Sequence, residues 1–408
     1  MNFKSRVEMS RNARAIVFAT ALSLLPVKRL LAEERVDFKF NYFLEDNHRS
    51  EVYTPSVLLE TDLGVHTTLR LHGVYDVISG ATPTGEPLKQ RTKVVPATGP
   101  ASAPTGMMAV SGPSNRPSAP VVGTAIVPYG SPFLPTANYH DKRVAVDAEL
   151  EHHAGEWILA GGGAFSKESD YVSISESARI GRYFNDRSTT VSLGVAFNQD
   201  SILDVWKKKY VGKDTVEGLV TISQILDKDT LLTLNYAPGY SKGYLDDQYK
   251  VTQLNGAVVP ERRPHTRDKH AVYLLLNRFI KPLNGSIEAS YRFYTDSYNI
   301  TAHTLGLTWY QKLGEHFILA PSARYYQQTA ADFYHVAFTG NPTYYSADYR
   351  LSKLAATTFG MKAIWKFSDK FSMDISYDRY TQWGRDGKTS NEAYPKANIV
   401  TMGFKLWF

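Results

Sequence analysis

Residues 191–198 read VSLGVAFN, and this short stretch decides the fold. One face of the extended chain carries apolar side chains and the other carries small or polar ones, because successive side chains of a β-strand point to opposite faces. The apolar set is Val191, Leu193, Val195 and Phe197. A strand of about ten residues with this alternation is typical of a membrane β-barrel, with one face to lipid and one to a polar lumen.

The alternation recurs along the chain, for example in SIEASYRFY at 286–294 and KFSMDISYD at 370–378. We expect strands at 36–44, 52–61, 64–75, 142–152, 156–167, 170–181, 188–199, 214–225, 229–240, 268–279, 285–296, 301–312, 315–328, 352–366, 370–382 and 397–408. An even number of strands lets a single chain close with both ends on one side. The predicted fold is all-β, a transmembrane antiparallel up-and-down barrel of about 16 strands.

The connections between these segments alternate between short and long. Short connections are expected around 62–64, 154–155, 185–187, 227–229, 282–285, 312–314 and 368–369, and long ones at 76–141, 241–267, 329–351 and 383–396. Membrane barrels have short periplasmic turns and longer extracellular loops. We therefore expect the long connections to be extracellular.

The chain ends in NIVTMGFKLWF at 398–408, which alternates up to the terminal Phe408. A final strand with a carboxy-terminal phenylalanine resembles the signal read by the outer-membrane barrel assembly machinery. We expect Phe404, Leu406 and Phe408 to form that signal. The assembly machinery and outer-membrane lipid are the corresponding expected partners.

The amino terminus explains the basic composition. Six basic residues and one acidic residue fall in 1–32, so of the net charge of +6 only about +1 remains for 33–408. A net charge this small does not provide the positively charged surface that a nucleic-acid-binding protein needs. The basic start, the apolar run at 15–25 and Ala32 before two glutamates are typical of a secretory signal peptide. We expect 1–32 to be cleaved, with a retained signal anchor as the alternative, and the mature chain, 33–408, to lie in the outer membrane of a Gram-negative bacterium.

Absent residue types and motifs argue against catalysis and cofactors. The chain has no cysteine, which excludes disulfides, thiolate metal sites and a cysteine nucleophile. It has no HExxH, Walker or GxSxG arrangement, and its histidines form no set with a nucleophile and an orienting group. We expect no catalytic residues, no cofactor and no metal bound as a cofactor.

A proline-rich insert interrupts the regular pattern. Eleven of the 20 prolines lie at 83–135 among glycine, serine, threonine and alanine, a composition that builds neither membrane strand nor packed core. We expect 80–138 to be an extracellular loop insert. A solvated loop, a plug folded into the lumen and a ligand-binding or adhesive loop are its open alternatives.

Five stretches together resemble a large family of uncharacterised Gram-negative outer-membrane proteins, classed as a domain of unknown function. They are DVISGATPTGEP at 76–87, SKGYLDDQYK at 241–250, ERRPHTRDKHAVYL at 261–274, RYYQQTAADFY at 324–334 and YYSADYRLS at 344–352. The resemblance covers most of 36–408 and implies a barrel at the cell surface, without an agreed activity. The insert at 88–137 departs from it, being longer than the family needs.

Two sets of polar residues are candidates for function. The alternation turns one set toward the lumen: Asp147, Glu149, Glu151, Glu288, Arg292, Arg324, Lys362, Lys366 and Asp374. Their mixed signs indicate a polar lumen without a strong ion preference, since a selective pore shows a ring of one sign. The alternative is a salt-bridge network that fills the barrel and blocks flow.

The second set lies where strands leave the membrane on the loop side: Asp76, Ser79, Gly80, Asp246, Asp247, Arg262, Arg263, Asp332, Asp348 and Arg350. These residues would hold a cation or small solute at the outer rim, or would tie the loops together by salt bridges. The leading interpretation is a pore or solute channel with a loop-constricted entrance. The alternative is a closed-lumen surface barrel that binds a ligand or a periplasmic or surface protein.

Overall fold

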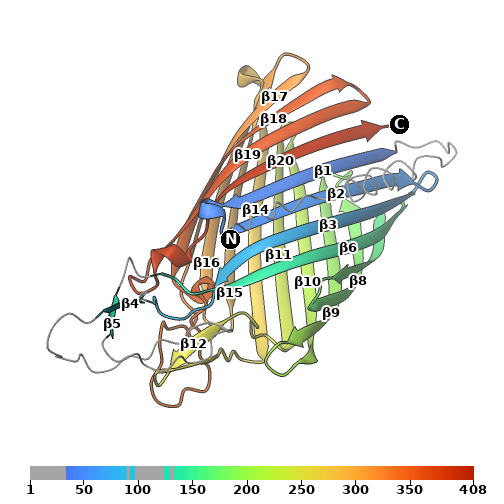
Figure 1. Cartoon of the computed structure of the whole chain (residues 1–408). Helices are drawn as coiled ribbons and strands as arrows, with labels where there is room; N and C mark the ends of the chain where they lie inside the picture. Colours follow the sequence, from blue (N-terminus) through green and yellow to red (C-terminus); the bar gives the residue numbers. More distant parts are fainter. Residues whose placement is uncertain (1–33, 90–91, 97–123, 129–132) are drawn as a thin grey trace.

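The computed structural model describes residues 34–89, 92–96, 124–128 and 133–408, so the predicted signal peptide lies outside the described residues. Sixteen strands form a closed barrel (Figure 1). In barrel order they are β1 (Arg35–Glu45), β2 (Ser50–Asp62), β3 (Thr67–Pro83), β6 (Thr136–Ala154), β7 (Trp157–Lys167), β8 (Tyr171–Phe184), β9 (Thr189–Asp204), β10 (Lys209–Asp227), β11 (Thr230–Gly243), β14 (Thr266–Ile280), β15 (Gly285–Asp296), β16 (Thr301–Leu313), β17 (Phe317–Gln328), β18 (Leu354–Ser368), β19 (Phe371–Gly384) and β20 (Lys396–Trp407).

Every pair of neighbouring strands is antiparallel, and β1 pairs with β20 to close the barrel, with Arg35 opposite Trp407. The predicted closed 16-stranded barrel is confirmed. Short elements decorate one end: β12 (Val251–Leu254), β13 (Ala257–Pro260), η1 (Asp46–His48), η3 (Tyr349–Leu351) and η4 (Asn391–Ala393), whereas η2 (Lys281–Leu283) lies at the other.

The two ends of the barrel differ in loop length. The turn end, where β1 begins and β20 ends, carries connections of two to four residues. The loop end carries long connections at 84–135, 244–265, 329–353 and 385–395. In Figure 1 the yellow β12 hairpin marks the loop end at the bottom, and the label C marks the turn end at the upper right.

Strands β3 and β6 are longer than the sequence predicts. Their ladder runs without interruption from Thr67 opposite His152 to Pro83 opposite Thr136. Backbone hydrogen bonds continue beyond the apolar band because they do not depend on which side chains the strands carry. Asp76, Ser79 and Gly80, which we expected at the rim, therefore lie within the wall.

The barrel exterior carries a continuous apolar belt. Phe359, Trp365, Leu193 and Leu305 each remain more than half exposed, and they lie on the face opposite the polar positions of their strands. An exposed belt of this kind marks a surface that contacts lipid, and a closed sheet satisfies every backbone group inside a membrane. The structure is therefore a membrane-spanning barrel. No helix in the described ranges has the length and apolarity needed to cross a membrane.

The predicted insert at 80–138 begins and ends inside β3 and β6. Its described part contains β4 (Thr92–Pro96) and β5 (Thr124–Pro128), which pair with each other in a separate two-stranded sheet. Figure 1 shows this sheet projecting from the loop end. The remainder of the insert lies outside the described residues, so its predicted role is not tested.

Candidate functional site

Loops from distant strands meet over the loop end of the barrel. We call residues 84–85, 244–265 and 329–353 the cap. The Nζ of Lys250, between β11 and β14, donates to Thr82 Oγ1 at 2.7 Å and to the Pro83 carbonyl at 2.5 Å. Both acceptors lie on β3, and five strands, β6 to β10, separate β3 from β11 on the shorter way round. A contact between such distant strands crosses the mouth of the barrel.

Backbone contacts hold the parts of the cap together. The Val251 amide donates to the Thr84 carbonyl at 2.8 Å, and Arg262 exchanges backbone hydrogen bonds with Tyr345. Gly85 has a φ of +96°, and a Cβ there would lie 2.5 Å from the Val251 carbonyl oxygen. Only glycine permits this close approach of the two loops.

A buried network of ions lies at the centre of the cap. Asp348 is 1% exposed and accepts from Arg263 Nη2 at 2.8 Å and from Arg350 Nη2 at 2.6 Å. Arg263 Nε lies 2.7 Å from Glu261 Oε1, and Glu261 is 4% exposed. Arg350 also pairs with Asp247. Buried charges persist where they are paired, and each charge of this network has a charged partner, although Arg263 Nε itself makes no hydrogen bond.

The environment of the network shifts its pKa values in opposite directions. Burial raises the pKa of Glu261 to about 7, opposed by the charge of Arg263. Burial lowers the pKa of Lys250 to about 8, opposed by the charge of Asp348. The Arg350 and Lys250 charges overcome burial and hold the pKa of Asp348 well below its usual range. The cap therefore contains groups whose ionisation depends on its being folded.

The predicted rim residues fall into separate places. Five of them meet in or beside the buried network: Asp246, Asp247, Arg263, Asp348 and Arg350. Asp76 is buried in the wall, 2.5 Å from Arg143 Nε, and Ser79 and Gly80 pair in register with Glu51 and Ser50. Arg262 contributes backbone hydrogen bonds, and Asp332 accepts from Asn299. These contacts are of the kind that tie loops together.

A pocket of about 700 Å³ lies beside the cap, between residues 297–298 and 332–344. Aromatic rings supply much of its lining: Tyr298, Phe333, His335, Phe338 and Tyr344. The rings of Tyr298 and Phe333 are held edge to face, with their centroids 4.9 Å apart. Aromatic walls with a few polar groups are common in ligand pockets.

On one wall of the lumen, near the turn end, ion pairs form a continuous ladder across β20, β1, β2, β3, β6 and β8. Its links are Lys405–Asp37, Asp37–Arg35, Arg35–Glu60, Glu60–Arg70, Arg70–Glu149 and Glu151, and Glu151–Arg179. Arg179 reaches across β7 because Ala160, in register between it and Glu151, is small. The ladder side chains are 10–36% exposed, so water reaches most of them.

The predicted lumen residues divide between paired and unpaired groups. Glu149 and Glu151 belong to the ladder, Asp147 pairs with His72, and Lys362 lies 3.1 Å from Asp374. The remaining four, Glu288, Arg292, Arg324 and Lys366, form no ion pair in the part of the chain that the structure describes. All nine alternate with outward apolar or small residues of their strands.

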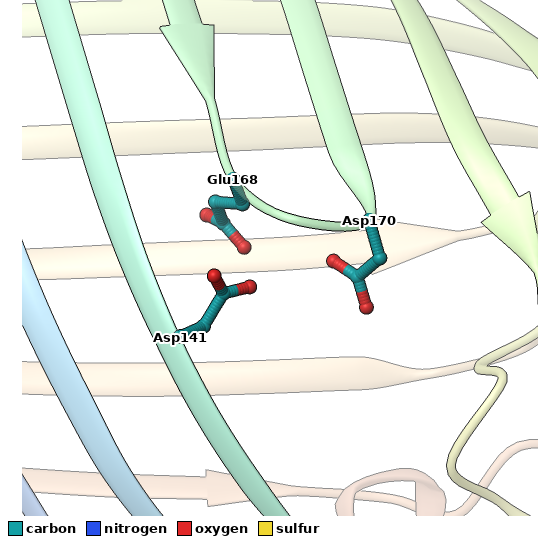
Figure 2. Close-up of side chains that lie close together, drawn as sticks. All are labelled: Asp141, Glu168 and Asp170. Atoms are coloured by element: carbon teal, nitrogen blue, oxygen red, sulfur yellow. The ribbon is translucent and has the colours of Figure 1, made fainter.

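Three carboxylates gather beside the cap (Figure 2). Asp141 comes from β6, and Glu168 and Asp170 from the connection between β7 and β8, with one oxygen of each within 4.8 Å of the others. Burial and the Asp141 charge raise the pKa of Glu168. Carboxylate oxygens suit a hard cation such as Ca²⁺. A calcium titration of the melting transition tests the cation hypothesis, because a barrel whose transition does not move holds no calcium there.

Comparison with known proteins adds a family to this geometry. A family model described as "Protein of unknown function (DUF3570)" matches residues 12–212 and 204–402. The chain belongs to this family. The predicted resemblance to a family of uncharacterised barrels is therefore confirmed. None of the curated proteins compared matches the chain.

Solved structures similar to this DUF3570 member are membrane barrels. A bacterial polysaccharide outer membrane secretin is 10% identical, with a TM-score of 0.47, and the match covers 93% of this chain and 98% of that one. CdiB from Acinetobacter baumannii is 7% identical, with a TM-score of 0.48, over 93% of this chain and 61% of that one. The outer membrane protein opdK from Pseudomonas aeruginosa is 9% identical, with a TM-score of 0.42, over 93% and 99%. At such identities the function of this chain has to come from its own residues.

Several residues of the site were missed from the sequence. Lys250 and Glu261 stand inside the stretches that carry the family resemblance, yet nothing local marks them as buried. The direction of the predicted strands could have located the three carboxylates of Asp141, Glu168 and Asp170. Because neighbouring strands run in opposite directions, the connection before β6 and the connection between β7 and β8 lie at the same end of the barrel. The barrel-assembly residues lie on or next to β20: Phe404 faces Phe38 with ring centroids 6.2 Å apart, and Leu406 and Phe408 are exposed.

Proposed function

We propose that this protein is a pore for small solutes in the outer membrane of a Gram-negative bacterium, with its extracellular entrance constricted by the cap. The observation that carries the proposal is the contact of Lys250 with β3, which takes a loop across the mouth of the barrel. Long loops of membrane barrels are extracellular, so we assign the loop end to the cell surface.

The lumen supports this proposal because its walls are polar and wet. The side chains of Asp147 and Glu217 lie on the inward faces of β6 and β10, and each is 50% exposed. A barrel of about 16 strands encloses more space than inward side chains fill, so a water-filled path remains unless loops obstruct it. The cap is the obstruction that would control passage.

Planar bilayer recording tests the pore. The purified chain, reconstituted at low protein density, is expected to give discrete conductance steps smaller than those of an unobstructed barrel of its size. A heat-denatured sample from the same preparation is the control and should give none. A tight seal under all ionic conditions and voltages, with a correctly folded sample, would overturn the proposal.

The aromatic pocket favours a second candidate, a surface barrel that binds a ligand or protein partner through its loops. This candidate expects a partner in stoichiometric amount after mild detergent extraction, and no conductance. Replacing Phe338 with alanine removes one wall of the pocket. Loss of the partner from that variant would support binding, whereas steady conductance without any partner would favour the pore.

A further inference from the structure

The inward-facing arginines of the barrel divide into two classes. Five of them are ion-paired: Arg35, Arg70, Arg143, Arg179 and Arg267. Arg292 on β15 and Arg324 on β17 have no carboxylate within ion-pair distance among the described residues, and both are exposed. The ring of Tyr326 lies beside Arg324, with the guanidinium carbon 5.8 Å from the centroid. An unpaired guanidinium facing a lumen is free to bind a passing anion.

The two arginines stand on either side of one strand. Arg292 is in register with Thr304 of β16, and Arg324 with Gly306, the next inward position of the same strand. Strands lie about 4.8 Å apart, so the two backbones are about 10 Å apart. Two long guanidinium side chains can converge on one small ligand across that gap.

The surface between the arginines offers hydroxyl groups. Ser290 and Thr358 lie in the same register row as Arg324, and the Ser290 hydroxyl takes the space over Gly306, 2.6 Å from where a Cβ would lie. The nearest acids on this wall do not neutralise the pair. Asp296 is held by Arg267, and Asp374 lies 3.1 Å from Lys362. Glu288 and Asp378 both lie one register row nearer the turn end than Arg324.

The wall as a whole has an excess of positive charge. The inward positions of β15 to β19 carry five basic residues, Arg292, Lys312, Arg324, Lys362 and Lys366, and four acidic ones, Glu288, Asp296, Asp374 and Asp378. Asp374 pairs with Lys362 and Asp296 with Arg267 of β14, which leaves four basic groups against two acidic ones. The ladder on the other side of the lumen alternates in sign and is locally balanced. The lumen therefore has one neutralised wall and one positive wall, which attracts anions into a confined aqueous space.

From this arrangement we infer that Arg292 and Arg324 form a binding site for small oxyanions, solutes that carry a phosphate or carboxylate group, on the path through the lumen. This inference rests on the proposed pore and specifies its substrate class. The guanidinium fork matches both groups, because two parallel N–H donors meet two oxygens. The site lies on the lumen side of the cap, where a solute that has passed the cap would meet it.

Reversal potentials in a salt gradient test selectivity. The wild-type pore is expected to be more permeable to chloride than to potassium. In the double variant R292Q/R324Q the chloride-to-potassium permeability ratio should fall by about threefold or more. This is a modest part of the ion enrichment that a cleft lined by charges of one sign produces. R292K/R324K keeps both charges and should keep the preference. Arg278→Gln removes a charge from the outer face of β14, away from the lumen, and should change nothing. Equal selectivity in wild type and R292Q/R324Q would overturn the inference while leaving the pore intact.

Binding is measured without any need for conduction. Inorganic phosphate and acetate, at constant ionic strength, are titrated against the melting transition of the detergent-solubilised barrel. Either probe should raise the transition of wild type and of Arg278→Gln but not that of R292Q/R324Q, and the more effective probe identifies the preferred group. No effect of either probe on wild type overturns the site. Protection by a probe in a barrel that never conducts keeps the site and rejects the pore.

Discussion

Two networks of ion pairs, built from the same residue types, lie in different surroundings in this barrel. In the cap, Asp348 and Glu261 are 1% and 4% exposed and are surrounded by other loops. In the lumen ladder, the side chains of Arg70 and Glu149 are 33% and 36% exposed. The cap network is dry, and the ladder is wet.

The difference shows that burial, more than the number of ion pairs, decides what a network does. A wet pair gains little because water and salt screen it, so the ladder mainly keeps one wall neutral. Burying a network of charges has a large desolvation free energy, and removing one partner costs still more because it leaves a buried charge unpaired. The network therefore stabilises one arrangement of the loops. The cap network can therefore hold the loops in one position over the mouth of the barrel, whereas the ladder only covers part of the lumen wall with paired charges.

The largest expected effect comes from Asp348→Asn. This change removes the buried carboxylate that pairs with both Arg263 and Arg350 and lies near Lys250, and breaking a buried pair from one side costs about 3–5 kcal/mol. We expect faster hydrogen exchange throughout 244–265 and 329–353, with little change in the barrel strands. Asp332→Asn, an exposed aspartate of the same loop, should cost below about 1 kcal/mol. Equal exchange in the two variants would mean that the network does not hold the cap.

Changing pH should act on the cap through Glu261. Its pKa rises from the usual 4.5 to about 7 in the folded cap, so the folded state binds the proton more tightly. Cap stability should therefore fall as pH rises from about 4.5 to 7, by about 1–3 kcal/mol, and this slope should vanish in Glu261→Gln. Exchange rates of cap amides, corrected for intrinsic rates, measure it. A slope that persists in the variant would assign the effect to another group.

The ladder should respond weakly and in a salt-dependent way. Arg70→Gln removes links to Glu60, Glu149 and Glu151, yet the guanidinium is one-third exposed, so we expect a loss of about 1 kcal/mol at low salt. Most of the loss should disappear at about 1 M salt, where the screening length is about 3 Å. Thermal unfolding in detergent measures both, with Arg278→Gln as a control. A large, salt-independent loss would place the ladder in the same class as the cap network.

The smallest expected effect is an increase in stability, in the variant Glu168→Gln. Glu168 lies among like charges and its pKa is raised, so its ionised form is disfavoured in the folded state. Glu168→Gln should stabilise the protein above the raised pKa, by below about 1 kcal/mol because the group is only half-buried, and the gain should vanish as pH falls and the native carboxyl becomes protonated. Melting temperatures at pH 8 and pH 4.5 measure it. Destabilisation at pH 8 would show that the charge has a partner.

The same contrast separates what the sequence predicts from what it does not. Period-two alternation located all 16 strands, because lipid and lumen impose opposite demands on neighbouring residues such as Val195 and Ala196. It ended β3 too early, at Tyr75 instead of Pro83, because the ladder continues where the lipid constraint stops. The alternation also predicted that all long connections lie at one end of the barrel, because each strand reverses the direction of the chain.

The cap could not be derived in this way. Lys250 and Thr82 are 168 residues apart in sequence and on distant strands, and no local pattern records that they meet. Asp348 and Arg263 stood among the predicted rim residues, but burial alone distinguishes them from Asp332 or Arg262. Likewise Arg70 and Arg324 have similar neighbours along the chain, and only the register of the strands shows which of them has partners.

Conductance of Asp348→Asn recorded beside wild type and Asp332→Asn tests the central claim most directly, that a dry ionic network holds a cap across the mouth of a pore. We predict small conductance steps in wild type and Asp332→Asn, and larger or longer-lived steps in Asp348→Asn. Identical steps in all three, with the cap of Asp348→Asn shown to be open by hydrogen exchange, would contradict it.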